Sequence, residues 1–423
     1  MKDINRREFV KTTLAIGSAT LFTFNAVGLT HHQNEIRVRR DVGELSDDDI
    51  ILQTYRRGVD LLKKLPKTDF RNWDNLAKVH LDFCPHGNWF FLPWHRAYLH
   101  SFENIIREIT NSPEFALPYW DWTKDTQIPS SFWKDTLNDA SRQVTQNDTI
   151  SPESTGTQVI ADVMREKKFE LFGSTKPFNQ TSTDTRFQRA RGALSLLERT
   201  PHNDVHNWIN GNMASMLSPI DPIFWLHHCN VDRIWADWNS KGNSNTSDQL
   251  WRDFTFRQNF VLSKDKRYDV IVKNLEDTIR LGYRYHGINP VSDQVLAIAS
   301  TPFLETNFQD KFASMRAAFS KLGQESVFPV ELSDQAVSKT KNLRTDLVTK
   351  GEQPRVLAIV KNVDPGTASS VRVRVFLDCD YLSQDTPPND PHYVGSLSFF
   401  GASNDHTGHH GMDKETNFSY ILI

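Results

Sequence analysis

The chain is poor in cysteine, in net charge and in long apolar runs, and each shortage excludes a class of protein. Three cysteines among 423 residues, Cys84, Cys229 and Cys379, are too few for a disulfide framework. The formal net charge is −3 and basic residues form no block, so the sequence indicates no nucleic-acid partner. The weakly apolar stretch 12–29 is rich in Thr, Ser and Gly, so we expect no stable membrane span.

The N-terminus reads as an export signal. Residues 5–11, NRREFVK, resemble a twin-arginine motif and precede that weakly apolar stretch. Residues 1–30 are therefore predicted to be a twin-arginine-type signal, which places the protein in the periplasm or outside the cell. A retained membrane anchor is the alternative.

Histidine, by contrast, is concentrated in two short clusters. The first lies in HLDFCPHGNWFFLPWHRAYLHSFE and the second in PHNDVH and DPIFWLHHCNVDR. The clusters contain His80, His86, His95, His202, His206 and His228. Three neutral imidazoles per metal suit copper, zinc or iron, so the sequence predicts two metal ions side by side.

The second cluster has helical spacing. His202 and His206 lie four residues apart, which puts both rings on one face of a helix. Asn203 stands where the glutamate of the HExxH zinc-protease pattern would be, which disfavours a hydrolytic zinc site. An exposed or core helix face is the alternative for this pair taken alone.

The third histidine of this cluster lies on a separate predicted helix. Asp221-Pro222 is typical of a helix start, and the helix should run from 223 to about 238. It carries His228, with Asp232 one turn later to orient nearby groups. His227 points about 100° away and need not be a ligand.

The first cluster combines a loop and a helix. His86 is expected in the loop 84–87, and His95 on a helix beginning near Pro93, with Glu103 on the same side to support the ligands. The run NWFFLPW contributes to the core, and a histidine in so apolar a run is costly unless its nitrogens are satisfied. Metal ligation would satisfy them.

These stretches resemble the type-3 copper proteins, namely tyrosinases, catechol oxidases (polyphenol oxidases) and molluscan-type haemocyanins. The first signature comprises His86, Phe91, Trp94-His95-Arg96, Leu99 and Glu103, and the second Asp221-Pro222, Phe224, His228 and Asp232. Residues 117–122 (LPYWDW), 232–235 (DRIW) and 282–285 (GYRY) also match, and the resemblance spans roughly 36–393.

The resemblance implies a mainly α catalytic domain in which a four-helix bundle holds a dinuclear copper site. By this likeness His80, His86 and His95 bind one copper ion (CuA), and His202, His206 and His228 bind the other (CuB). It also implies a thioether between Cys84 and His86, with a free buried thiol as the alternative. Cys229 and Cys379 then remain as free thiols or as one disulfide.

Further residues near the ligands have roles implied by the family. Glu198 matches a water-holding glutamate of plant members, and Asn203 could orient that water, so this pair favours monophenol hydroxylation. The alternative for Glu198 is a solvated helix charge. Asn207, Met213 and Met216 are expected to shape substrate access, and ordinary core is equally compatible with the methionines.

The C-terminal quarter changes character. The copper domain is predicted to span 36–330, followed by a polar linker at 331–352 and a C-terminal β domain at 353–423 with alternating or β-branched runs. This part resembles the small β-sandwich domain of family members, which can cap the copper site with one plugging side chain. Tyr381 and Leu382 are the candidates for the plug, and a purely stabilising domain is the alternative.

The predicted function is a copper-dependent phenol oxidase that o-hydroxylates monophenols and oxidises o-diphenols to o-quinones with dioxygen. A strict catechol oxidase or an o-aminophenol oxidase is the nearest alternative. A haemocyanin-like oxygen carrier is a third, disfavoured by the export signal and by the single copy of the unit. A dormant proenzyme that is activated by cleavage in the linker is compatible with the phenol oxidase function.

Overall fold

The computed structural model describes residues 36–288 and, in the C-terminal part, 358–363, 372–376, 379–383, 385–401 and 418–422. The predicted signal at 1–30 and the predicted linker at 331–352 lie outside the described residues. We call 37–288 the helical body and 358–422 the C-terminal part.

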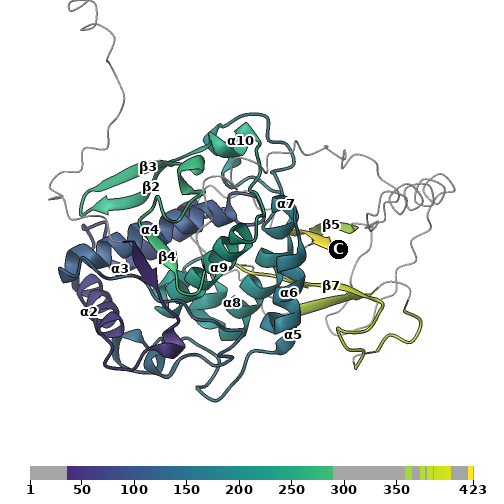
Figure 1. The fold of residues 1–423 in the computed structure, drawn as a ribbon, viewed down its shortest axis with the longest axis horizontal. Helices are drawn as coiled ribbons and strands as arrows, with labels where there is room; N and C mark the ends of the chain where they lie inside the picture. Colours follow the sequence, from purple (N-terminus) through teal and green to yellow (C-terminus); the bar gives the residue numbers. More distant parts are fainter. Residues whose placement is uncertain are drawn as a thin grey trace, which may run out of the picture. The chain divides into compact units, whose positions relative to one another are not determined.

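Helices dominate the helical body (Figure 1). The longer ones are α2 (Ile50–Lys64), α3 (Trp73–Phe83), α4 (Phe91–Thr110), α6 (Thr157–Arg165), α8 (Asn203–Ile209) and α9 (Ile223–Ser240). Shorter ones are α5 (Pro152–Thr155), α7 (Phe169–Phe172), α10 (Gln249–Arg252) and a π-helical turn, η5 (Glu198–His202). Single 3-10 turns are η1 (Val42–Glu44), η2 (Ser130–Trp133), η3 (Asp135–Leu137), η4 (Thr185–Phe187), η6 (Gly211–Ala214), η7 (Ser218–Ile220) and η8 (Val272–Leu275).

Local sequence sets where the main helices begin and end. Asp49 and Asn72 cap α2 and α3 by accepting the amide N–H two residues ahead. Helix α4 ends at Asn111, whose left-handed backbone (φ 52°) closes the last turn. The Asp221 carboxylate accepts the Ile223 N–H at 3.0 Å, so α9 starts where it was predicted to.

The core is unusually aromatic. Eight tryptophans are less than 2% exposed: Trp89, Trp94, Trp120, Trp122, Trp225, Trp235, Trp238 and Trp251. Helices α4 and α9 pack against each other through this core, where the rings of Phe102 and Trp225 stack at 3.6 Å. Two small sheets complete the helical body: β1 (Arg37–Arg39) pairs in parallel with β4 (Tyr283–Tyr285), and β2 (Thr255–Ser263) pairs antiparallel with β3 (Lys266–Ile271).

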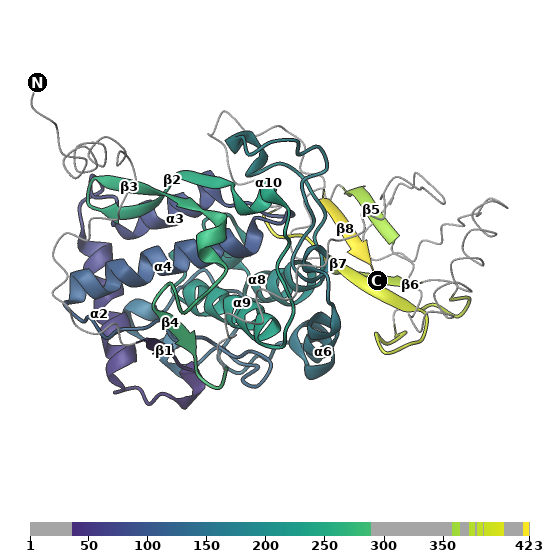
Figure 2. The same ribbon diagram turned by 45° about the horizontal axis from the view of Figure 1, so that its top comes forward.

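The C-terminal part contains two antiparallel strand pairs (Figure 2). Strand β5 (Ala358–Val363) pairs with β8 (Phe418–Leu422), and β6 (Arg372–Phe376) with β7 (Tyr393–Ser398). The predicted strands are therefore present. The predicted β-sandwich is not established, because the described residues form two separate two-stranded sheets.

Backbone hydrogen bonds join the C-terminal part to the helical body. The Leu194 N–H donates to Ser419 O at 2.8 Å, and the Ile421 N–H donates to Leu194 O at 3.0 Å. Leu194 also packs with Leu397, Phe399 and Tyr420 in one buried cluster. Residues 194–204 consequently connect strands β7 and β8 to the helices that carry the second histidine cluster.

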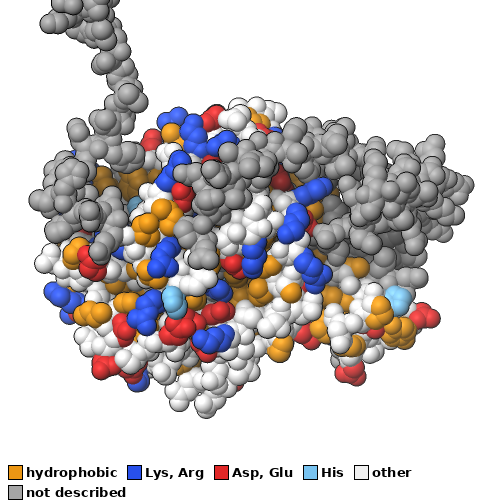
Figure 3. Space-filling model, in the orientation of Figure 1, with side chains coloured by type: hydrophobic (Ala, Val, Ile, Leu, Met, Phe, Trp, Pro, Cys, Tyr) orange, Lys and Arg blue, Asp and Glu red, His pale blue; other side chains and the backbone are white. Residues whose placement is uncertain are grey.

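Acidic and basic side chains are interspersed across the described part of the face in Figure 3 rather than gathered by sign. Among the described residues, no helix combines the length and apolar character needed to cross a bilayer.

Candidate metal centre

Five helical segments and one loop bring the six predicted ligands together. His80 lies in the last turn of α3, His95 in the second turn of α4 and His228 in α9. His202 ends the π-helical turn and His206 follows in α8, so this pair does not lie on one regular α-helix as predicted. His86 lies in the loop between α3 and α4, as expected.

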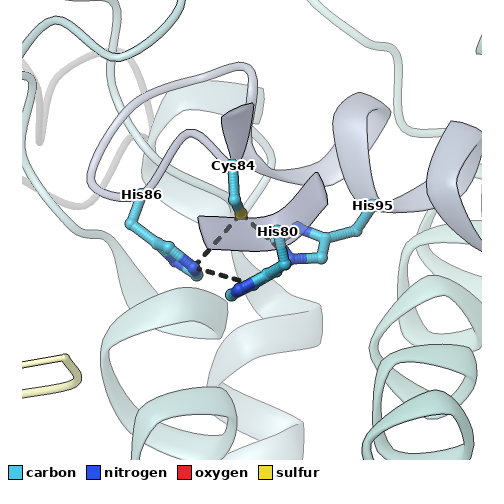
Figure 4. Close-up of side chains that lie close together, drawn as sticks. All are labelled: His80, Cys84, His86 and His95. Carbon is cyan, nitrogen blue, oxygen red and sulfur yellow. Dashed lines mark hydrogen bonds between the residues drawn. The ribbon is translucent and has the colours of Figure 1, made fainter. Parts of the chain in front are cut away.

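The first cluster converges on a point between its rings (Figure 4). His86 Nε2 lies 3.4 Å from His80 Nε2, and the His80 and His95 ring centroids are 5.6 Å apart. In the second cluster, His206 Nε2 lies 3.2 Å from His228 Nε2. The two clusters adjoin, since the rings of His95 and His228 stack at 4.1 Å.

Hydrogen bonds at Nδ1 orient five of the six rings. His80 Nδ1 lies 2.7 Å from Met216 O, His95 Nδ1 2.8 Å from Phe91 O and His206 Nδ1 2.6 Å from Met213 O. The Nδ1 atoms of His202 and His86 face side-chain oxygens, Asn203 Oδ1 at 2.8 Å and Glu198 Oε1 at 3.1 Å. An acceptor at Nδ1 places the ring proton there and leaves the Nε2 lone pair for a metal.

Burial keeps these rings neutral. Five of the six are at most 2% exposed, and the His86 side chain is 16% exposed. Desolvation lowers the pKa of His80 to about 4 and that of His202 to about 3. It holds the pKa of His86, His95, His206 and His228 well below the usual range. Neutral imidazole is the form that binds a metal.

One further observation indicates that these residues suit a pair of metal ions. Among the described residues, the buried His202 Nε2 has no hydrogen-bond partner. A buried nitrogen without a partner is costly unless something outside the protein satisfies it. Neutral nitrogen donors, three to each cluster, suit copper.

Cys84 lies within the first cluster. Its thiol is buried, with Sγ 3.3 Å from His86 Nε2 and 3.4 Å from His95 Nε2. Burial raises the pKa of the thiol well above its usual value. The sulfur thus lies equally close to two ligand rings, whereas the sequence singled out His86.

Glu198 lies behind the first cluster and is fully buried. Its Oε1 accepts the Gly87 N–H at 2.8 Å and faces His86 Nδ1, while Oε2 accepts the Ser174 hydroxyl. Burial raises the pKa of Glu198 to about 8. A solvated helix charge, the alternative from sequence, is excluded by this burial.

Asn203 connects the second cluster to the C-terminal part. Its Oδ1 accepts from His202, and its Nδ2 donates to Ser398 O at 3.1 Å. The next residue, Asp204, accepts the Ser398 hydroxyl and lies 3.4 Å from Arg372 of β6. Both polar ends of the Asn203 amide are therefore engaged.

Phe400, which follows β7, lies over both clusters. Its ring centroid is 4.3 Å from that of His206, 4.8 Å from His86 and 5.7 Å from His202, and the residue is 5% exposed. The Gly401 N–H fixes the following turn by donating to Ala214 O at 3.3 Å. An aromatic side chain of the C-terminal part thus covers the histidines.

The prediction that Tyr381 or Leu382 fills this place is wrong in its choice of residue. Tyr381 is 55% exposed, and its hydroxyl lies 3.0 Å from Asp390 Oδ2 within the C-terminal part. Leu382 adjoins it on the same turn and is partly buried. A turn beyond β6 cannot fill the site when Phe400 already packs on the histidine rings.

The three predicted substrate-access residues lie in or just after α8. Asn207 and Met216 are partly buried, and Met213 is fully buried. The backbone carbonyls of both methionines accept from ligand rings, a role that side-chain type does not signal. Met216 also lies against Gly401, so it borders the place that Phe400 fills.

Glu103, expected to support the ligands, instead holds Arg39 and Arg107, whereas Asp232, expected to hydrogen-bond or orient nearby groups, holds the buried Arg96. Glu103 pairs with Arg39 at 2.9 Å and with Arg107 at 2.7 Å. Asp232 pairs with Arg96 at 2.6 Å. Main-chain carbonyls orient three of the predicted ligand rings, and side-chain oxygens of Glu198 and Asn203 face two more.

Comparison with known proteins points the same way. The family model described as the common central domain of tyrosinase matches residues 67–195 and 133–241, ranges that include all six histidines. A tyrosinase of Hahella sp. (strain CCB-MM4), HcTyr1, is 27% identical over 87% of this chain and 86% of its own length. The chloroplastic polyphenol oxidase of Spinacia oleracea is 28% identical over 60% of this chain. The chain spans about half of that relative, 48% of its length.

Solved structures give the same likeness. A latent apple tyrosinase matches with a TM-score of 0.53 and 26% identity, over 60% of this chain and 63% of its own. A latent aurone synthase, described as a polyphenol oxidase, matches with a TM-score of 0.63 over 93% of this chain and 83% of its own. At 19% identity, the second likeness concerns the fold alone.

Proposed function

Because the chain belongs to the type-3 copper family of tyrosinases and polyphenol oxidases, we propose that it oxidises phenols with dioxygen at a pair of copper ions. The observation that carries this is the convergence of six neutral histidines, five of them with an oxygen at Nδ1. His80, His86 and His95 would hold CuA, and His202, His206 and His228 would hold CuB. The copper pair, when bound, supplies the redox chemistry that passes electrons from the phenol to dioxygen.

The protein's own residues position the ligands and exclude water. Backbone carbonyls from α4 and from the segment after α8 fix three rings, so the site needs little reorganisation when metal binds. Phe91 packs edge-on at 4.7 Å from the His202 ring and 4.8 Å from the His95 ring, which keeps the floor of the site apolar. Such a floor suits a phenol ring.

We further propose that the enzyme hydroxylates monophenols as well as oxidising diphenols. Glu198 would receive the phenolic proton through a water held with Asn203. The proximity of Glu198 to His86, and of Asn203 to His202, supports these roles. Among the similar proteins, one is named a tyrosinase and another a (+)-larreatricin hydroxylase. A strict catechol oxidase or an o-aminophenol oxidase is the alternative within the same class.

The C-terminal part would keep the site closed until it is displaced. Support comes from Phe400 on the ligand rings and from the hydrogen bond that holds Asn203 to Ser398 O. In this arrangement, Phe400 occupies the place that a phenol would need, and the Asn203 amide that would orient water is hydrogen-bonded to Ser398 O. The similar apple tyrosinase is itself described as latent.

Export by a twin-arginine-type signal remains our proposal for residues 1–30. Such export carries folded proteins, which would let the copper be loaded first. Similar plant enzymes, among them those of Spinacia oleracea, Vicia faba and Malus domestica, are named as chloroplastic.

The decisive experiment compares copper-loaded protein, intact and cleaved by protease within 331–352, on tyrosine and on a catechol. Cleaved protein that forms quinone from both substrates supports the proposal. Quinone from the catechol alone would favour a catechol oxidase. Reversible oxygen binding without quinone from either form would favour the haemocyanin-like carrier.

A further inference from the structure

Two adjacent histidines of α9 compete for the second copper position. His227 and His228 each present a ring nitrogen within 4.8 Å of those of His202 and His206. Both residues are at most 1% exposed, and the His227 ring centroid lies 4.7 Å from that of His206. Burial and distance therefore do not decide which of the two binds the metal.

The hydrogen bond at Nδ1 of His227 differs in kind from those of the predicted ligands. Trp122 Nε1 lies 3.1 Å from His227 Nδ1. An indole N–H can only donate, so Nδ1 must offer its lone pair. The proton of the neutral ring then lies on Nε2. The ligands His80, His95 and His206 show the reverse, because a carbonyl oxygen at Nδ1 leaves Nε2 unprotonated.

Neither nitrogen of His227 is left to bind a metal. Nδ1 is taken by the indole, and Nε2 carries the proton, although this buried N–H has no hydrogen-bond partner among the described residues. Rotating the ring by half a turn would direct a C–H at the indole N–H and lose the hydrogen bond. A doubly protonated ring would set two N–H groups against each other.

We propose that Trp122 prevents His227 from binding the second copper ion. The third ligand of this ion, beside His202 and His206, is then His228, and one of its coordination positions stays open. A catalytic metal needs such a position, which a fourth imidazole would close. Trp122 is thus a positioning residue, and its function is to select which of two neighbouring histidines binds copper. The inference rests on the proposed copper site but not on the proposed activity.

The ring protonation can be measured directly in metal-free protein labelled with 15N-histidine. Long-range 1H–15N correlation should show His227 with an unprotonated Nδ1 and a protonated Nε2, and His206 with the opposite arrangement. The His227→Gln variant assigns the signal by removing it. A protonated Nδ1 in His227 would overturn the proposal, and neither activity nor copper enters this measurement.

A second measurement uses copper as the probe. Trp122→Phe keeps a buried aromatic ring but removes the N–H, which frees His227 to bind. Because one added histidine ligand is averaged over two copper ions, X-ray absorption of the copper-loaded variant should show about half a nitrogen more per copper. His227→Gln added to this variant should restore the original value. Trp120→Phe is the matched control, because Trp120 donates to Asp125 O instead. An unchanged nitrogen count in folded Trp122→Phe would contradict the proposal. If that variant does not fold, the 15N measurement on the wild-type protein alone tests the proposal.

Discussion

The ring of Phe400 lies with its centroid 4.3 Å from that of His206, although the two residues are far apart in the chain. Burying a phenylalanine side chain stabilises by about 1.5–3 kcal/mol. Since about 1.4 kcal/mol corresponds to a tenfold change in population, Phe400→Ala should raise catechol oxidation by the intact chain roughly tenfold or more. The measurement is initial quinone formation at equal copper content.

Tyr381→Ala is the matched control for this prediction. It removes an aromatic side chain of the C-terminal part that is 55% exposed, so activity should stay at the wild-type level. Activation by Tyr381→Ala but not by Phe400→Ala would restore Tyr381 as the plug. Equal, low activity in both variants would mean that Phe400 does not limit access.

Arg372 on β6 holds the C-terminal part against the helical body. Its Nη2 donates to Glu153 O at 2.6 Å and lies 3.4 Å from the buried Asp204 carboxylate. We expect Arg372→Gln to weaken the closed arrangement by about 1–2 kcal/mol, the range for a partly exposed pair with hydrogen bonds. Catechol oxidation by the intact chain should then rise several-fold, and added salt should activate the wild type more than the variant.

Arg374 on the same strand is the control for Arg372. Its Nη1 donates to Thr386 O within the C-terminal part, so Arg374→Gln removes the same charge from β6 and should activate the intact chain less than Arg372→Gln does. Similar activation by both variants would point to general loosening of β6. No activation by Arg372→Gln would show that this contact does not hold the site closed.

Glu198→Gln tests the proposed base. The variant keeps the size and the hydrogen bond from the Gly87 N–H but cannot take a phenolic proton. Tyrosine hydroxylation by the opened protein should fall by about 10²-fold or more, the usual contribution of a general base, while catechol oxidation changes little. Ser174→Ala removes a hydroxyl that lowers the pKa of Glu198, so it should reduce tyrosine hydroxylation less than Glu198→Gln does and leave catechol oxidation near the wild-type level. Equal losses on both substrates in Glu198→Gln would refute the base role.

A thioether at Cys84 has a definite mass signature. Forming it breaks the Cys84 S–H bond and a ring C–H bond of His86, joins sulfur to carbon and passes two electrons and two protons to dioxygen. Tryptic peptide 79–96 of copper-loaded, air-exposed protein should therefore be lighter by two hydrogens than that of metal-free protein. Cys84→Ser should show no such loss.

The same peptide contains His95, whose Nε2 is almost as close to the sulfur. Tandem fragmentation between 86 and 95 distinguishes the two partners, and we expect the link at His86. A Cys84 that is freely alkylated in unfolded, copper-treated protein would rule out a thioether to either ring.

Local patterns were sufficient to predict the two helices that carry His95 and His228. Asp221-Pro222 predicted a helix from 223 to about 238, and α9 runs from Ile223 to Ser240. The i, i+4 spacing of the second cluster was less reliable, because Pro201 lacks an N–H and precedes a change from π-helical to α-helical hydrogen bonding at Asn203. The spacing identified the pair but not its local geometry.

The parts of the site that were missed depend on contacts between distant segments or on the main chain. Successive residues of an extended chain face opposite ways, so SLSFFG allows one phenylalanine to turn inward but does not say over what. The carbonyls of Met213 and Met216 orient ligands without any signal in side-chain type. Trp122 belongs to the LPYWDW stretch that resembles the family, but no pattern in the sequence indicates that its N–H meets His227.

The motif residue Asp232 stabilises the fold rather than the metal ligands, and this can be tested. It accepts from Arg96 Nε at 2.6 Å and from the hydroxyls of Tyr283 and Tyr285 at 2.7 and 2.6 Å, and Arg39 lies at 3.4 Å. Asp232→Asn leaves the buried Arg96 guanidinium without its counter-charge, which should lower the free energy of unfolding by about 3–5 kcal/mol. Asp237→Asn, on the same helix, breaks a partly exposed pair with Lys241 and should cost less than about 1 kcal/mol. Urea unfolding of the metal-free proteins separates the two, and an Asp232→Asn variant as stable as Asp237→Asn would show that the buried network contributes little.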